Sequence, residues 1–242
     1  MNILLLRPED LQPDGTARLV GRRLVHAREV LRAAAGDLLR VGLLYGQLGT
    51  AKVLDLSDDA LLLGPSFTEP PPARPFIDLL LAMPRPKALR RLLPALASLG
   101  VDRLVLLNAA RVEKSFFDAG VLAPASVEAL FAEGLEQARD TRPPQLLVRD
   151  RFRPFVEDEL PALVPNAQAL VAHPHAARSP AGLPQRAGRR LLLAIGPEGG
   201  WVPFELELLA RQGFEAVTLG PRILRVEVAV PLLLGALSGL AL

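Results

Sequence analysis

The 242-residue sequence predicts an α/β protein in which a parallel-sheet domain follows a small β domain. The main evidence lies in segment 191–242, where a buried-strand pattern, a glycine- and proline-rich loop and a helix pattern follow one another twice. In segment 76–107, an apolar run, a helix pattern and a second apolar run follow in the same order. Sequential strand-helix-strand units form parallel sheets, because the helix returns the chain to the edge where the next strand begins.

Residues 1–67 predict the small β domain. Short apolar runs alternate with glycines there, as in the strands of a small barrel or sheet, at 3–6, 38–44, 51–56 and 60–63. Between the first two runs, Leu24, Val30 and Leu31 lie near helical spacing, and Gly36 is suited to end that helix. The proline-dense segment 68–75, TEPPPARP, predicts a stiff linker, so we expect the second domain to span 76–242.

The second domain is expected to alternate strands with helices. Strands are predicted where apolar residues are continuous, at 76–83, 104–107, 169–172, 191–195 and 216–219. The first helix should end at Gly100, and Pro94 should either kink it or mark an irregular start. The helix after the second strand should stop at Pro143. A further helix is expected between Pro203 at its first position and Gly213 beyond its end.

Composition excludes several classes of protein. Half of the residues are apolar, but no run has the length of a transmembrane helix and the opening lacks the core of a signal peptide. A cytoplasmic protein is therefore expected. The absence of cysteine excludes disulfides, thiolate nucleophiles and zinc-thiolate sites. His173 and His175 lack a third ligand nearby, so no metal is expected.

Positive charge is concentrated, although the net charge is only +2. Segment 74–114 holds eight basic residues against three acids, and segment 178–190 holds four arginines and no acid. Guanidiniums bind phosphates bidentately and stack on bases, which favours a nucleic-acid partner, but composition alone fits a solvated surface equally well. The candidate RNA-binding residues are Arg7, Arg22, Arg23, Arg28, Arg32, Arg85, Lys87, Arg111, Lys114 and Arg142, with Arg139 as the alternative to Arg142.

Two glycine- and proline-rich loops follow predicted strands, at 196–200 and at 220–221. Ligands of open parallel sheets bind at the carboxyl ends of strands, where both loops should lie. Glycines let the backbone approach a flat ligand, and prolines stiffen the loops, although simple turns would use the same residues. Arg222, Arg225 and Glu227 follow the second loop directly.

These motifs carry a resemblance to a known family. IGPEGG, a following helix with Glu205, and LGPRILR resemble the carboxyl-terminal signature of the RsmE family of ribosomal RNA uridine methyltransferases, in the SPOUT superfamily. The resemblance covers nearly the whole chain and is strongest over 191–229. It implies a PUA-like β-barrel domain that binds RNA, followed by a SPOUT methyltransferase domain with a C-terminal trefoil knot. Pairing of the knot helices is expected to form a homodimer.

The resemblance also implies a reaction, the methylation of a uridine at ring N3 in small-subunit (16S) ribosomal RNA by S-adenosyl-L-methionine. Arg225 would stabilise the anionic ring, and Glu227 would orient Arg225 or accept the proton. A side chain added at Gly199 or Gly220 should occupy the adenine slot. The residues expected to hold the cofactor are His173, Pro174, Ile195, Gly196, Pro197, Glu198, Gly199, Gly200, Leu219, Gly220, Ile223, Leu224 and Ala229.

Two other functions compete with this one. A catalytically weak RNA-binding or ribosome-assembly protein that kept the fold is favoured by Val226 and Val228, which stand where the family has threonines. A nucleotide-binding α/β protein unrelated to SPOUT would place phosphate at a glycine loop before a helix. The chain lacks the P-loop lysine and the Rossmann glycine spacing that such a protein would use.

Overall fold

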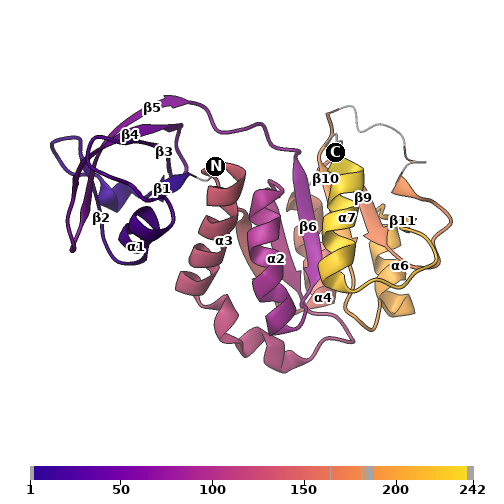
Figure 1. Ribbon diagram of the computed structural model, residues 1–242. Helices are drawn as coiled ribbons and strands as arrows, with labels where there is room; N and C mark the ends of the chain where they lie inside the picture. The colour runs from indigo at the N-terminus through magenta and orange to yellow at the C-terminus, as the bar shows by residue number, and fades with distance from the viewer. Residues whose placement is uncertain (1–2, 164, 181–182, 184–187, 239–242) are drawn as a thin grey trace. The chain divides into compact units, whose positions relative to one another are not determined.

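A computed structural model of the chain describes residues 3–163, 165–180, 183 and 188–238. The chain divides into two compact units, each with a sheet of its own (Figure 1). The first unit comprises Met1–Ala73 and Ala132–Pro143, and the second comprises Arg74–Phe131 and Pro144–Leu242.

The first unit is built on a five-stranded sheet in the order β1-β3-β4-β5-β2. Its strands are β1 (Leu4–Leu6), β2 (Ala17–Leu19), β3 (Leu38–Leu43), β4 (Leu48–Leu56) and β5 (Leu61–Glu69). The β1 and β3 strands pair in parallel, and the other neighbours are antiparallel. The helix α1 (Arg22–Glu29) and the 3-10 turn η1 (Pro8–Asp10) complete it, and buried Leu6, Leu24 and Leu63 lie in its core.

Three details of this unit differ from the sequence prediction. The short strand β2 was not predicted, because three residues carry too little alternation to be recognised. The helix ends at Glu29 instead of continuing toward Gly36, and Arg32 has a positive φ of 52° that no helix accommodates. The strand β5 includes Thr68 and Glu69, which were assigned to the linker, because Glu69 pairs with Leu48 of β4.

The segment 132–143, which was assigned to the second domain, packs with the first unit. Glu136 accepts hydrogen bonds from the main-chain N–H groups of Ile3 (3.2 Å, to the carbonyl) and Leu5 (3.3 Å, to Oε1). Thr141 donates from Oγ1 to the carbonyl of Gly46 at 2.6 Å. The sequence predicted the helix that carries Glu136, but helical periodicity alone does not say which sheet a helix joins.

The second unit holds a six-stranded sheet in the order β11-β9-β10-β6-β7-β8. Every neighbouring pair is parallel, which confirms the predicted parallel sheet. Its strands are β6 (Ile77–Ala82), β7 (Arg103–Leu107), β8 (Gln145–Arg149), β9 (Gln168–Ala172), β10 (Leu191–Ile195) and β11 (Glu215–Val217). The edge strand β8 was not predicted, and β11 ends before Thr218 and Leu219, which form a turn instead.

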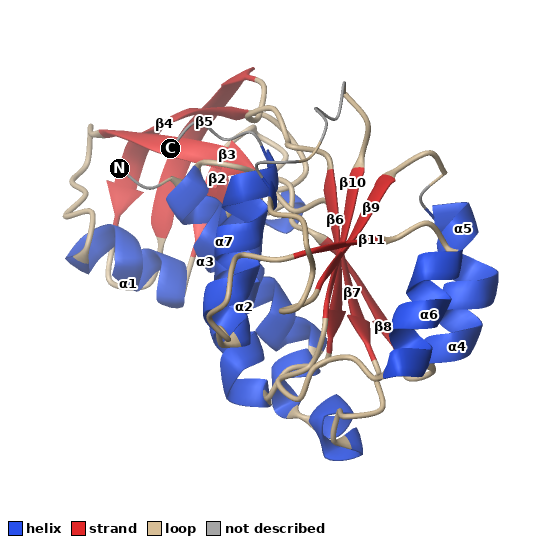
Figure 2. Cartoon of the chain, turned by 90° about the vertical axis from the view of Figure 1, so that its right-hand side faces the viewer, coloured by secondary structure: helices blue, strands red, loops and turns tan. Residues whose placement is uncertain are grey.

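Helices cover both faces of this sheet. Figure 2 shows α2 and α7 on one face, and α4, α5 and α6 on the other. Pro86 opens α2 at its first position, and Pro94 lies inside it. Among the described residues, no helix is long and apolar enough to cross a membrane. The bounds are α2 (Pro86–Ser98), α3 (Pro124–Ala138), α4 (Phe152–Pro154), α5 (Leu160–Leu163), α6 (Pro203–Arg211) and α7 (Val226–Ser238), with η2 (Lys114–Asp118), η3 (Gly120–Leu122) and η4 (Phe155–Glu159) between them.

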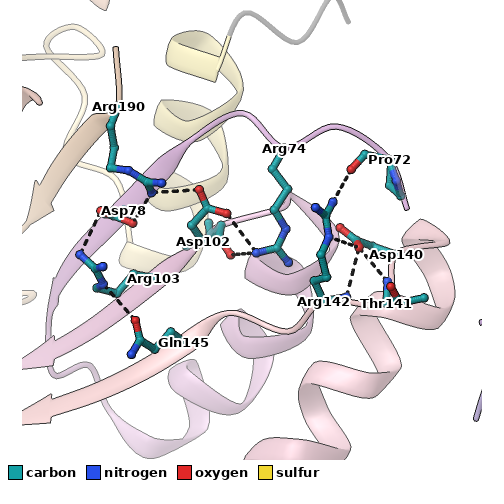
Figure 3. Close-up of polar contacts among 11 residues, drawn as sticks. Pro72, Arg74, Asp78, Asp102, Arg103, Asp140, Thr141, Arg142, Gln145 and Arg190 are labelled. Atoms are coloured by element: carbon teal, nitrogen blue, oxygen red, sulfur yellow. Dashed lines mark hydrogen bonds and ion pairs between the residues drawn. The ribbon is translucent and has the colours of Figure 1, made fainter. Parts of the chain in front are cut away.

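A cluster of arginines and aspartates joins the amino ends of three strands of this sheet (Figure 3). Asp78 of β6 is 1% exposed, and it accepts hydrogen bonds from Arg190 (2.9 Å) and Arg103 (3.3 Å). Asp102 accepts from the same Arg190 (2.9 Å) and from Arg74 (3.1 Å). Burial raises the pKa of Asp78, and the charges of Arg103 and Arg190 act against that rise. The cluster fixes the starts of β6, β7 and β10 relative to one another.

We expect Asp78→Ala to lower the free energy of unfolding by about 2 kcal/mol, because it leaves Arg103 and Arg190 without a carboxylate that both now share. The loss should be smaller than for a fully buried pair, since both guanidiniums reach solvent. Urea denaturation at neutral pH measures it, with Asp55→Ala on the exposed side of β4 as the control. Equal stability of the two variants would contradict this role.

Candidate active site

A cavity of about 410 Å³ opens in the second unit at the carboxyl ends of β9, β10 and β11. Three loops form its wall, 173–175, 196–201 and 218–224, together with residues of α7. The strand order brings these loops together, because β10 lies between β9 and β6 and β11 pairs with β9. All the residues that the sequence assigned to cofactor binding line this one cavity: His173, Pro174, Ile195, Gly196, Pro197, Glu198, Gly199, Gly200, Leu219, Gly220, Ile223, Leu224 and Ala229.

The glycines of loop 196–200 make room for protein side chains. A Cβ at Gly196 would lie 3.0 Å from the ring of Trp201, whose buried indole Nε1 has no hydrogen-bond partner among the described residues. A Cβ at Gly199 would lie 3.0 Å from Cδ of Arg111. A side chain added at Gly199, which was expected to fill the adenine slot, would therefore contact Arg111. Gly200 has a positive φ of 75°, which a residue with a Cβ rarely adopts.

Thr218 holds the other two loops together. Its hydroxyl accepts the N–H of Gly220 (3.1 Å) and is within donating distance of the carbonyl oxygens of Pro174 (3.3 Å) and Gly220 (3.1 Å). Gly220 has a φ of +108°, and no atom lies within 4 Å of an added Cβ. A substitution at Gly220 is therefore expected to disturb the loop through its backbone conformation and not through crowding by a side chain. Sequence reasoning missed Thr218, whose only local signal is a hydroxyl residue two positions before a glycine.

A buried carboxylate ties the loop after β7 to the loop after β10. Glu205, in the first turn of α6, is 2% exposed. Its Oε1 accepts the N–H of Ala110 (2.7 Å) and its Oε2 accepts the N–H of Val202 (2.9 Å). Next to Ala110, the guanidinium of Arg111 donates to the carbonyl of Gly199. Arg111, predicted to bind RNA, therefore also lines the cavity.

Charge in the cavity wall is mixed. Glu198 is the only carboxylate among the described residues that line it, and its Oε2 lies 3.0 Å from Nε of Arg85. Both side chains of this pair are partly exposed, so the pair can open at small energetic cost. Arg111 and Arg222 contribute cations, and His173 and His175 contribute imidazoles.

Comparison with known proteins places this site in a family. Residues 71–238 match the family model described as an RNA methyltransferase domain. The ribosomal RNA small subunit methyltransferase E of Treponema pallidum is 31% identical over 233 residues, which cover 95% of this chain and 87% of that protein. The chain belongs to the ribosomal RNA small subunit methyltransferase E family. The resemblance found in the sequence is thereby confirmed.

A second curated relative and two solved structures are also similar to the chain. The enzyme of this name from Mycobacterium bovis is 29% identical over 172 residues, which cover 69% of this chain and 64% of that protein. Among solved structures, the methyltransferase E of Neisseria gonorrhoeae bound to S-adenosyl methionine matches with a TM-score of 0.76 and 21% identity, over 98% of both chains. A Legionella pneumophila protein solved with S-adenosylmethionine matches with a TM-score of 0.78 and 22% identity, over 98% of this chain and 97% of that one.

The two catalytic candidates taken from the methyltransferase E resemblance lie outside the cavity wall. Neither Arg225 nor Glu227 is among the described residues that line it. The carbonyl of Arg225 accepts the N–H groups of Val228 and Ala229 and so begins α7. The carboxylate of Glu227 lies 3.8 Å from the guanidinium of Arg91 on α2, so its ion pair among the described residues is with Arg91 and not with Arg225.

The candidate RNA-binding residues are divided between the two units. Four belong to the second unit, Arg85, Lys87, Arg111 and Lys114, and all four are exposed. In the first unit, Arg22, Arg28 and Arg32 are exposed, and four of the candidates form ion pairs within the unit. Arg7, Arg23, Arg28 and Arg142 pair with Glu9, Asp10, Asp58 and Asp140, respectively.

The pairing of Arg23 is the strongest of these. Both of its terminal nitrogens donate to the carboxylate of Asp10, which is 5% exposed and also accepts the N–H of Arg7 (2.7 Å). A bidentate contact with a buried carboxylate leaves little of the guanidinium for a phosphate.

Among the described residues, no three His, Asp or Glu side chains are grouped so that they could hold a metal ion.

We expect Glu205→Ala to lower the free energy of unfolding by about 2 to 3 kcal/mol, because the N–H groups of Ala110 and Val202 both lose their buried, charged acceptor. Hydrogen exchange at Ala110 and Val202 should accelerate with it. The matched control is Glu207→Ala, an exposed glutamate on the same helix, which should leave both quantities unchanged. If Glu205→Ala resembles Glu207→Ala, this carboxylate does not join the two loops.

Proposed function

We propose that this protein transfers a methyl group from S-adenosylmethionine to N3 of a uridine in small-subunit ribosomal RNA. The observation that carries the proposal is the cavity, in which three loops with the family's motifs form one wall. The names of its relatives support it, since the proteins of Treponema pallidum and Neisseria gonorrhoeae are called ribosomal RNA small subunit methyltransferases, and the latter was solved with S-adenosyl methionine.

The cavity suits such a cofactor in size and chemistry. Its volume of about 410 Å³ lies within the range of small-molecule sites. Ile195, Leu219 and Leu224 offer apolar surface for an adenine ring, and Glu198 offers a carboxylate for a cationic ligand. When bound, S-adenosylmethionine supplies a methyl group that bonds to N3 of the uridine, while the C–S electron pair stays on sulfur and the N3 proton goes to water or to Glu227.

The protein's part is then to orient the two ligands and stabilise charge. The loops fix the cofactor through backbone groups, because glycine and proline dominate their sequence. Two roles stay predictions. Arg225 would stabilise the anionic ring, and Glu227 would orient Arg225 or accept the proton. Their place at the start of α7, next to Val226 in the cavity wall, is compatible with entry of a substrate at that side.

RNA is proposed as the partner of both units. The first unit would act as the family's PUA-like domain, with Arg22 and Arg32 exposed for phosphates. In the second unit, Lys87 and Lys114 are exposed. They lie on the segments that follow β6 and β7, at the carboxyl end of the sheet, where the cavity opens. A flipped, single-stranded uridine is the expected target, because a paired imide cannot be methylated. A cytoplasmic location stays a prediction.

A homodimer through the C-terminal helix is part of the proposal. On α7, Val228 and Leu232 are 45% and 51% exposed, and Ile223 just before it is 86% exposed. A second copy would cover this apolar surface.

The trefoil knot stays a prediction too, because residues 181–182 and 184–187 of the connection between β9 and β10 lie outside the described part of the chain, as do residues 239–242.

The alternative is a ribosome-assembly protein that kept the fold but transfers methyl groups weakly. The observation that favours it is Val226, which is 5% exposed and lines the cavity where the family resemblance places a threonine. No hydroxyl is available from that position. The two functions are separated by turnover, because an assembly protein needs none.

The direct test is methyl transfer to small ribosomal subunits from cells that lack this gene. We expect the protein and S-adenosylmethionine to produce N3-methyluridine, detected by nucleoside analysis of the digested RNA. Subunits from cells that carry the gene are the control, because their target is already methylated. Stable binding to the subunits without any methylated nucleoside would favour the assembly protein instead.

Gly220→Val should weaken S-adenosylmethionine binding about tenfold or more while the protein remains folded. The positive φ of Gly220 costs a β-branched residue roughly 1 to 3 kcal/mol, so the loop must change shape. Calorimetry measures the affinity, and Gly120→Val serves as the control, since Gly120 lacks a positive φ and has open space around it. Unchanged affinity in folded Gly220→Val would exclude this loop from the cofactor site.

A further inference from the structure

Arg111 is a cation of the cavity wall that the structure holds in place. Its guanidinium donates to the carbonyl of Gly199. Its side chain lies so close over Gly199 that an added Cβ would be 3.0 Å from Cδ and 3.4 Å from Cβ of Arg111. The preceding N–H, of Ala110, donates to buried Glu205 at 2.7 Å. The backbone before Arg111 and its guanidinium therefore each have a hydrogen-bond partner, although the side chain is exposed, and these contacts limit reorganisation when charge develops nearby.

Other charged groups around the cavity are less suited to face an anion. Glu198 is negative and is paired with Arg85 at 3.0 Å. Arg222 lines the wall from the exposed loop after β11, and no hydrogen bond or ion pair of Arg222 is found among the described residues. His173 accepts the N–H of His175 on Nδ1 at 3.3 Å. On the loop of Arg111 itself, Glu113 and Lys114 are exposed and are absent from the cavity wall.

We propose that Arg111 stabilises the anion that forms when the target uridine loses its N3 proton. This inference rests on the proposed function and deepens it. Negative charge in the deprotonated ring is shared by N3 and the two flanking carbonyl oxygens, and a fixed guanidinium beside them favours the anion. Sequence analysis assigned this role to Arg225, which is not among the described residues that line the cavity, whereas Arg111 lines it from the loop after β7.

The inference has a consequence for the pH dependence of turnover. A cation next to the ring lowers the pKa of the bound imide, so the rate reaches its plateau at a lower pH. Without that cation the imide keeps its proton to higher pH. The rate at neutral pH then falls, and it continues to rise where the unaltered protein has reached its plateau. A residue that only shapes the loop would change cofactor affinity and leave this profile in place.

The experiment compares Arg111→Met, Arg111→Lys and Arg222→Met, with Arg211→Met on the exposed end of α6 as the control for a lost surface cation. The substrate is small ribosomal subunits from cells that lack the gene, with methyl-labelled S-adenosylmethionine. For Arg111→Met we expect kcat at neutral pH to fall about a hundredfold, the value typical of one lost charge-stabilising donor. Its pH profile should move to higher pH, and Arg111→Lys should recover part of both. Calorimetry should show S-adenosylhomocysteine affinity within about threefold of the unaltered protein.

The possible outcomes are distinct. An unshifted pH profile in Arg111→Met overturns the inference, and so does a shift produced by Arg222→Met but not by Arg111→Met. If Arg111→Met has no measurable turnover, the profile of Arg111→Lys decides. Failure of the unaltered protein to form N3-methyluridine overturns the proposed function itself, which the nucleoside analysis reports before any variant is made.

Discussion

The structure of the second unit depends on the insertion of β10 between β6 and β9. All five residues of β10 are buried, and the strand pairs in parallel with both neighbours. Because the three strands run in the same direction, the loops after β9 and β10 both lie at the carboxyl end of the sheet. The strand β11 pairs in parallel with β9 on its outer side, so the loop after β11 is the third at that end. The cavity is therefore a consequence of strand order.

The amino end of β10 explains how its register is held. The run LLLAI is apolar on both faces, so a slip by one residue would cost little in burial. Arg190, directly before the strand, donates to Asp78 of β6 and to Asp102 before β7. A slip would break both contacts of Arg190 and leave buried Asp78 with Arg103 alone. The polar cluster at one end of the sheet thus positions the glycine loop at the other end.

Sequence reasoning succeeded where a single segment contains the signal. The buried strand β10 is a continuous apolar run, β6 and β7 are apolar apart from Asp78 and Arg103, and glycine and proline follow β10 in the cavity loop. Prediction failed where the decisive partner is remote. The contacts of Glu205 with Ala110 and of Arg111 with Gly199 join residues 95 and 88 positions apart, and neither leaves a periodic pattern. Short edge strands such as β2 and β8 fail for a different reason, since partial exposure removes the apolar continuity.

The valines at 226 and 228 bear on how such a site can work. Valine keeps the branched shape of threonine and loses its hydroxyl, so Val226 preserves the wall of the cavity while removing a polar contact. Val228 is 45% exposed and is not part of that wall. Polar contacts in the cavity must then come from backbone groups, from Thr218 and from the charged residues. A fixed guanidinium needs no hydroxyl beside it to stabilise an anion, so loss of these threonines leaves charge stabilisation by Arg111 intact.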